Sequence, residues 1–149
     1  ILDGASCTLA VSEILGWDSD KDWRGLWTWP GVGRSAFSTS LTPNSKSNDR
    51  LSLFGCDSSI PNGHALKCDQ TKYERDGTDA AAARSQHLGG VNAVMCDGSV
   101  HFFVNRVDAD AWRSLGTVDG LKRDIPGLRK AELLPSEALK LALNPDEHL

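Results

Sequence analysis

The side-chain types that hydrolases use for nucleophilic catalysis gather in a short stretch in the second half of the chain. They are the imidazole, thiol, carboxyl and hydroxyl groups of His87, Cys96, Asp97, Ser99 and His101. A nucleophile needs a base within hydrogen-bond reach and an oxyanion donor. The spacing secures neither, because Asp97 belongs to a predicted turn while Ser99 and His101 fall on one strand face. We therefore predict no catalytic residue here. Instead we predict a structural motif of His87, Asp97 and Gly98, in which the His87 ring hydrogen-bonds backbone at the start of a hairpin.

A second group of candidate ligands is the acidic turn that carries Asp18, Asp20 and Asp22. Alternate carboxylates in a loop can converge on a hard cation such as calcium. The EF-hand pattern is not met, because Trp23 stands at its sixth position, where glycine is needed, and Trp29 at its twelfth, where glutamate is needed. We therefore interpret the segment as a solvated acidic turn and expect no required cofactor. Calcium bound by the three aspartates is the alternative.

Four of the five tryptophans fall within thirteen residues, namely Trp17, Trp23, Trp27 and Trp29. Exposed indoles form flat, amphipathic surfaces that suit a sugar ring or a partner protein. Buried indoles would instead supply the core of a small sheet that has few other large residues in this region. We expect at least two of the four to be core, and a binding platform if Trp27 and Trp29 face solvent.

The four cysteines, Cys7, Cys56, Cys68 and Cys96, include no C-x-x-C pair and allow three disulfide pairings. Cys56 and Cys68 bracket a polar, turn-rich segment with little else to order it, so they are the preferred pair. Closing a loop of this size stabilises a protein by about 3 kcal/mol. A disulfide also implies an oxidising, extracytoplasmic compartment. Cys7 and Cys96 are the remaining disulfide candidates, and four buried thiols in a cytosolic protein are the alternative.

The clearest secondary-structure signal is a pair of β-rich runs, Val91–Cys96 and Ser99–Val104, joined by Asp97-Gly98. Asp-Gly between two such runs predicts a hairpin with a type I′ turn, in which both central residues have positive φ. Further strands are predicted at 8–14, at 26–29 and at 51–54. Residues 69–83 show little pattern.

Two short helices are predicted near the C-terminus. Asp108 is an N-cap candidate for a helix that carries Ala111, Trp112 and Leu115 and ends at Gly116. The amphipathic segment 135–143 is the second helix, expected to pack on the domain or on a neighbouring copy. The predicted fold is α+β: a small antiparallel sheet of segments 8–14, 26–29 and the hairpin, with long loops and short C-terminal helices.

Composition excludes several classes of function. The chain has 149 residues, which favours one domain, and its 16 basic and 20 acidic residues give a net charge of −4. Binding to a phosphate backbone calls for a basic surface, so nucleic acid is not an expected partner. No apolar run approaches the length that a membrane-spanning helix requires.

The motif His87, nine residues, then Asp97-Gly98 resembles the prepilin-type H-x9-D-G family, whose function is unknown. Further landmarks resemble those of the family in the same order: Leu2–Ser6 with Glu13, Asp22–Gly25, Thr42–Ser45, Asn48-Asp49, Ala83–His87 and Ala111–Gly116. The likeness runs from about residue 2 to residue 118. It implies a pilin-like head domain over residues 1–118, followed by a C-terminal extension, residues 119–149, with a short helix. The family usually has asparagine at the position of Cys7, and its long N-terminal hydrophobic helix is absent from this sequence.

The resemblance implies a non-enzymatic structural or interaction subunit of a pilus-like or type II secretion pseudopilin-like assembly outside the cytoplasm. Its expected partners are protein subunits of that assembly, and membrane contact is expected only through the absent N-terminal helix. The alternative is an extracellular solute- or carbohydrate-binding module that uses the aromatic cluster between Trp17 and Trp29. A metal-assisted or nucleophilic enzyme is the least supported reading.

Overall fold

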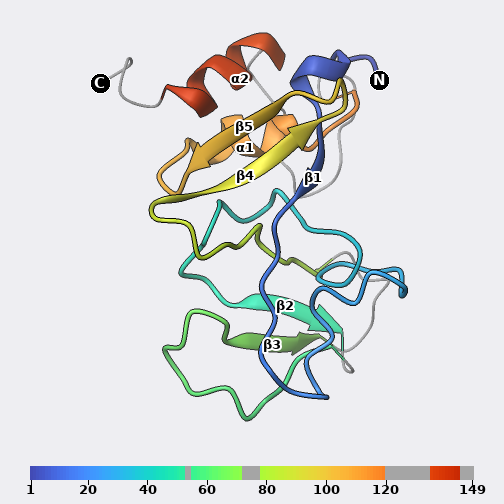
Figure 1. Cartoon of the computed structure of the whole chain (residues 1–149), viewed down its shortest axis with the longest axis vertical. Helices are drawn as coiled ribbons and strands as arrows, with labels where there is room; N and C mark the ends of the chain where they lie inside the picture. Colours follow the sequence, from blue (N-terminus) through green and yellow to red (C-terminus); the bar gives the residue numbers. More distant parts are fainter. Residues whose placement is uncertain (53–54, 72–77, 120–134, 145–149) are drawn as a thin grey trace.

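The computed structural model describes residues 1–52, 55–71, 78–119 and 135–144, which form a small α+β fold (Figure 1). Its elements, in chain order, are the 3-10 helix η1 (Ala5–Cys7), β1 (Leu9–Ser12), β2 (Asp49–Ser52), β3 (Cys68–Thr71), β4 (Gly90–Met95), β5 (Val100–Val104), α1 (Ala109–Leu115) and α2 (Pro135–Leu143). The predicted α+β class is confirmed. Within the described ranges, no helix has the length and apolar character needed to cross a bilayer.

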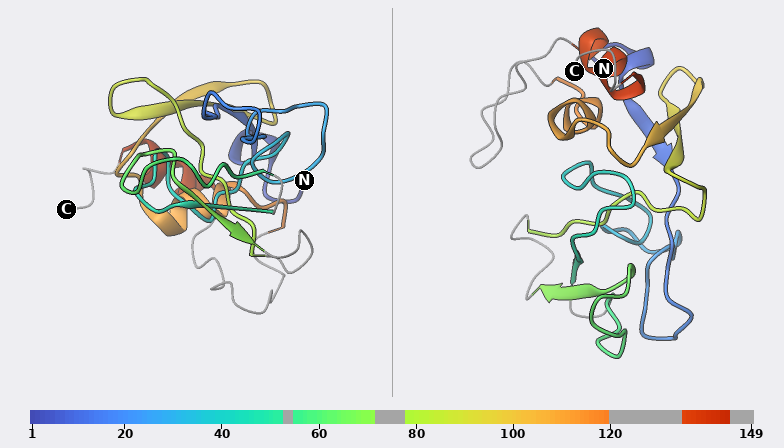
Figure 2. Two further views of the ribbon diagram at one scale, coloured as in Figure 1. Left: turned by 90° about the horizontal axis from the view of Figure 1, so that it is seen from below. Right: turned by 90° about the vertical axis from the view of Figure 1, so that its left-hand side faces the viewer.

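Two sheets lie at opposite ends of the molecule (Figures 1 and 2). One is a three-stranded antiparallel sheet in the order β1-β4-β5, which lies beside η1 and the two α-helices. The other is a parallel pair, β2-β3, surrounded by long loops. The chain leaves β1 and runs directly into this second region, so both parts share the N-terminal segment.

Side-chain alternation explains why the antiparallel sheet has one covered face. Val91 pairs with Phe103 across β4 and β5, and both are fully buried, whereas their neighbours Asn92 and Phe102 point to the other face. The covered face packs on α1 and α2, and Trp112 of α1 is buried in the same apolar cluster as Ala138 of α2. The C-terminal helix therefore packs on the domain.

The predicted hairpin is confirmed, but the predicted turn type is wrong. Of the two central residues only Gly98 has positive φ, at 87°, and Asp97 does not. The N–H of Gly98 donates to the Met95 carbonyl (3.0 Å), and the N–H of Met95 donates to the Ser99 carbonyl (2.8 Å). These bonds and the left-handed glycine fit a three-residue loop with a G1 bulge. An Asp-Gly pair is compatible with the type I′ turn and with the three-residue loop, and the register of β4 and β5 decides which of them forms.

Both predicted helices are present. The Asp108 carboxylate accepts hydrogen bonds from the N–H groups of Asp110 (3.0 Å) and Ala111 (2.8 Å), as an N-cap should. Gly116 ends α1 where a Cβ atom would lie 2.1 Å from Thr39 Oγ1, so only glycine fits. The indole N–H of Trp112 donates to the Leu41 carbonyl (2.9 Å), which ties the loop over α1.

The predicted strand 26–29 is wrong. This segment consists of turns, in which the N–H of Leu26 donates to the Trp23 carbonyl and that of Trp29 to the Leu26 carbonyl (both 3.2 Å). Alternating tryptophans suggested a half-buried strand, but within the described part of the chain no strand lies beside this segment to pair with it. The predicted strand 51–54 is shifted to β2, Asp49–Ser52, and residues 53 and 54 lie outside the described residues. β3 overlaps residues 69–83, where the sequence shows little pattern and no strand was predicted.

Candidate functional site

Four buried charges form a network between β2 and the loops around it. Asp49, fully buried on β2, accepts from Arg24 Nη1 (2.9 Å) and from Arg84 Nη2 (2.8 Å). Arg24 also donates to Asp22 Oδ2 (2.6 Å), and neither side chain of that pair is exposed. The hydrogen bonds to both carboxylates raise the pKa of the Arg24 guanidinium although its burial lowers it. Two guanidinium groups thus balance two carboxylates.

Backbone groups satisfy the rest of this network. Arg24 donates to the Leu66 carbonyl (2.7 Å), Arg84 donates to the Ser45 carbonyl (2.8 Å), and Asp49 accepts from the Ala82 N–H (3.1 Å). Because every partner is either an opposite charge or a loop backbone group, the network joins four separate chain segments. We interpret it as the structural centre of the loop region, since a buried charge is tolerated only when it is paired and hydrogen-bonded.

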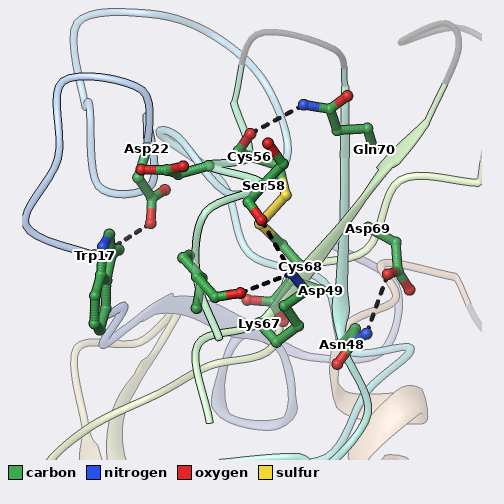
Figure 3. The surroundings of a disulfide bond; sticks show 12 residues. Trp17, Asp22, Asn48, Asp49, Cys56, Ser58, Lys67, Cys68, Asp69 and Gln70 are labelled. Atoms are coloured by element: carbon green, nitrogen blue, oxygen red, sulfur yellow. Dashed lines mark hydrogen bonds between the residues drawn. A yellow bond between two sulfur atoms is a disulfide. The ribbon is translucent and has the colours of Figure 1, made fainter. Parts of the chain in front are cut away.

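The predicted Cys56–Cys68 disulfide is present beside this network, with the two Cα atoms 5.8 Å apart (Figure 3). Lys67 Nζ donates to the Ile60 carbonyl (2.7 Å), and the Gln70 side-chain amide donates to the Cys56 carbonyl (3.1 Å), so side chains at the end of the bridged loop hold its backbone. The other two cysteines form no bridge: Cys7 is buried and Cys96 is exposed, both as free thiols.

His87 binds a side chain rather than the predicted backbone group. Its Nε2 lies 2.9 Å from Oε1 of Glu13, and the other Glu13 oxygen accepts from the Asn92 N–H (2.7 Å). Burial raises the pKa of Glu13, but the Asn92 N–H and the contact with His87 outweigh it, so the pKa lies below its ordinary value of 4.5. Glu13 also accepts the Arg84 N–H at its backbone carbonyl (2.9 Å). His87 and Glu13 together hold the segment before β4 against the end of β1.

Asp97 holds the hairpin turn. Its Oδ1 accepts from the Ser99 N–H (2.9 Å) and from the Ser99 hydroxyl (2.7 Å), and these bonds lower the pKa of Asp97. His101 Nε2 lies 3.2 Å from the same hydroxyl. In a hydrolase triad the carboxylate orients the imidazole, whereas here it binds the hydroxyl. His87 and Asp97 therefore contribute to the hairpin through different partners.

The three aspartates of the acidic turn do not converge on a cation site. Both oxygens of Asp22 bind Arg24, and its Oδ2 also accepts the Trp17 N–H (2.6 Å), while Asp18 and Asp20 are exposed. Among the residues described, no three His, Cys, Asp or Glu side chains gather as a metal site would require. The triplet therefore offers no converging set of ligands for calcium, because Asp22 belongs to the buried ion network.

The tryptophan cluster divides into two half-buried and two exposed side chains. Trp17 packs against the apolar cluster around the disulfide and meets the His64 ring edge-on at 4.8 Å. The Arg34 guanidinium lies 5.1 Å from the centre of the Trp23 ring, a cation–π contact. Trp27 is 80% exposed and Trp29 is 54% exposed. The first pair serves the structure, and the second pair faces solvent.

The uncovered face of the antiparallel sheet is mainly apolar, with Asn92 as a polar residue paired with Phe102. Val11, Val94 and Val100 lie side by side in register across β1, β4 and β5, and Val11 and Val100 are 58% and 63% exposed. Phe102 extends this row along β5, where its ring would clash with a Cβ atom at Gly90. We call Val11, Val94, Val100 and Phe102 the open sheet face. The half-exposed pair of His87 and Glu13 lies near it, since the His87 ring is 6.5 Å from that of Phe102.

Sequence reasoning did not find the roles of Glu13, Arg24, Asp49 and Arg84. Each stands inside a short motif that resembled a family landmark, but the motif does not reveal its partner. Asp49 is 25 residues from Arg24 and 35 residues from Arg84, and Glu13 is 74 residues from His87.

These features define a small α+β domain whose loops are held by one disulfide and by buried ion pairs. The family model described as "Protein of unknown function (DUF1559)" matches residues 1–110, and the chain belongs to this family. No curated protein and no solved structure matches the chain.

Proposed function

We propose that this domain is a non-enzymatic interaction subunit of an extracytoplasmic assembly of the pilus-like or type II secretion pseudopilin-like class. The observation that carries the proposal is the open sheet face. Three valines in register and the neighbouring Phe102, which pairs with Asn92, form a mainly apolar surface on the side of the sheet opposite the helices, with Val11, Val100 and Phe102 exposed. Exposed apolar patches of this kind mark sites of association with other proteins.

The shape of this surface suits one helix of a partner subunit. Neighbouring strands lie about 4.8 Å apart, so three strands offer a strip about 10 Å wide, close to the diameter of an α-helix. The same sheet already binds helices on its other face, where Val91 and Phe103 pack against α1 and α2. A helix with an apolar stripe would cover Val11, Val94 and Val100 in the same way.

Other observations support an export setting and a scaffolding role. The Cys56–Cys68 disulfide is typical of proteins that fold in an oxidising compartment. The reactive side-chain types of the hairpin are engaged in local structure, with Asp97 bound to Ser99 and His87 bound to Glu13. The likeness of His87, Asp97 and Gly98 to the prepilin-type H-x9-D-G motif agrees with this proposal.

Site-specific photocrosslinking in the cells that make the full-length protein tests the proposal. A benzophenone amino acid at Val100 should crosslink to a subunit of a pilus-like or secretion assembly. The same group at Ser58, exposed on the bridged loop, should not. In a second experiment the benzophenone group stands at position 102, and the substitution Val100→Asp should then abolish the crosslink. The free energy of unfolding of Val100→Asp should stay within about 0.5 kcal/mol of the wild type, because Val100 is exposed. No crosslink from position 100, or crosslinks to proteins of no such assembly, would overturn the proposal.

A further inference from the structure

We infer that Trp27 and Trp29 form a second binding surface, one that takes neutral saccharides. They lie in the exposed segment 25–30, which contains no charged residue. An indole stacks on the apolar C–H face of a pyranose ring while the sugar hydroxyls stay in water, so such a surface needs exposed and well-placed rings. Both rings are exposed, and the segment lies outside the strands that form the open sheet face.

The loop that carries the two indoles is anchored at both ends. Arg24, immediately before it, is held by Asp22 and Asp49. Gly33, after it, accepts the Gly25 N–H (2.9 Å) at its carbonyl. A Cβ atom at Gly33, where φ is +85°, would lie 2.5 Å from Leu51 Cδ2, so the loop sits directly on β2. A surface that is ordered before binding loses less conformational entropy when the ligand arrives.

The half-buried Trp23 supports one of the two exposed indoles. Trp23 is fixed by Arg34 over its ring, and the centre of the Trp23 ring lies 6.2 Å from that of Trp29 at an angle of 58°. Trp29 therefore rests against a ring that is itself held in place. Trp27 stands more freely, at 80% exposure, and is the residue on which a ligand can stack with little obstruction.

The exposed indole area matches the size of a small ligand. With about 250 Å² for a whole tryptophan side chain, the exposed fractions of Trp27 and Trp29 leave about 335 Å² of accessible surface. The area is close to what one or two sugar rings can cover. A membrane surface is disfavoured, because peripheral attachment to anionic lipid relies on Lys and Arg, which the segment 25–30 lacks.

Titration calorimetry with three neutral hexasaccharides, of β-1,4-glucose, β-1,4-N-acetylglucosamine and α-1,4-glucose, tests the inference. The wild type should bind at least one of them. Trp27→Ala should weaken that binding about tenfold or more. Leu88→Ala is the matched control, because it removes an apolar side chain that is 99% exposed elsewhere, and it should leave the affinity unchanged. Far-UV circular dichroism checks that each variant is folded.

Three results would overturn the inference. The first is that the wild type binds none of the saccharides up to their solubility limits. The second is that Trp27→Ala and Leu88→Ala change the affinity equally. The third is that Trp27→Ala abolishes sedimentation with phosphatidylcholine–phosphatidylglycerol vesicles or self-association while no saccharide binds. None of these depends on the crosslinking experiment, so the saccharide site and the open sheet face can fail separately.

Discussion

Replacing Asp49 by alanine removes the carboxylate that lies between two buried guanidinium groups. Arg24 then keeps only Asp22 as an ionic partner, and Arg84 keeps only backbone carbonyls. The Ala82 N–H, which donates to Asp49, loses its acceptor as well. The variant therefore leaves an uncompensated positive charge and an unsatisfied donor in the interior.

The expected loss of stability follows from this geometry. Breaking a buried ion pair by removing one partner costs about 3 to 5 kcal/mol, because the remaining charge stays buried. For a chain of 149 residues this corresponds to a fall in Tm of roughly 10 to 16 °C. Asp49→Asn keeps the size of the side chain and one acceptor oxygen, so its stability should lie between that of Asp49→Ala and that of the wild type.

The assay is urea unfolding of the oxidised protein at neutral pH, followed by tryptophan fluorescence and by circular dichroism. Asp69→Ala is the matched control, because Asp69 is exposed on the adjoining β3 and accepts one bond from Asn48 (3.1 Å). The control should lose less than about 1 kcal/mol. If the free energy of unfolding of Asp49→Ala lies within about 1 kcal/mol of that of Asp69→Ala, the network is not the structural centre of the loop region. That result would refute the role inferred for the buried ion pairs.

Three further predictions concern the hairpin, the thiols and Glu13. Gly98→Val forces a β-branched residue to φ of 87° and should lower the free energy of unfolding in urea by about 1 to 2 kcal/mol. An unchanged urea midpoint would contradict the left-handed conformation of residue 98 in the hairpin turn. Thiol titration of the unreduced protein should detect the exposed Cys96 at once and the buried Cys7 only after unfolding, and four reactive thiols would disprove the disulfide. Because folding lowers the pKa of Glu13, its stabilising effect is complete above the ordinary value of 4.5 and is lost as the pH falls through the lower folded value. Glu13→Gln should therefore destabilise the protein at neutral pH and progressively less as the pH falls below 4.5, and an equal effect over this whole range would argue against the ionised partner.

The elements predicted correctly are those that short-range chemistry decides. The hairpin follows from Asp97-Gly98 between two β-rich runs, and α1 follows from a capping residue, Asp108, and a terminating glycine. The disulfide was found because Cys56 and Cys68 enclose a short polar loop. In each case the interacting groups are close in sequence, so a local pattern contains the needed information.

The predictions that failed depend on a partner far away in the chain. The segment 26–29 has the alternation of a strand, but a strand also needs a neighbour, and none of the strands in the described ranges lies beside it. The parallel pairing of β2 with β3 joins Asp49 to Cys68 across a long loop. Asp22 resembled a cation ligand until the fold placed Arg24 against both of its oxygens.

By itself, the amino-acid sequence determined the α+β class, the hairpin, both helices and the bridged loop, because propensity, capping and loop closure act over a few residues. Only the tertiary structure decided which charges are buried together, which indoles face solvent and which side of the sheet stays uncovered. Those outcomes depend on burial and pairing between residues such as Glu13 and His87, 74 positions apart, and no local pattern specifies a contact at that separation.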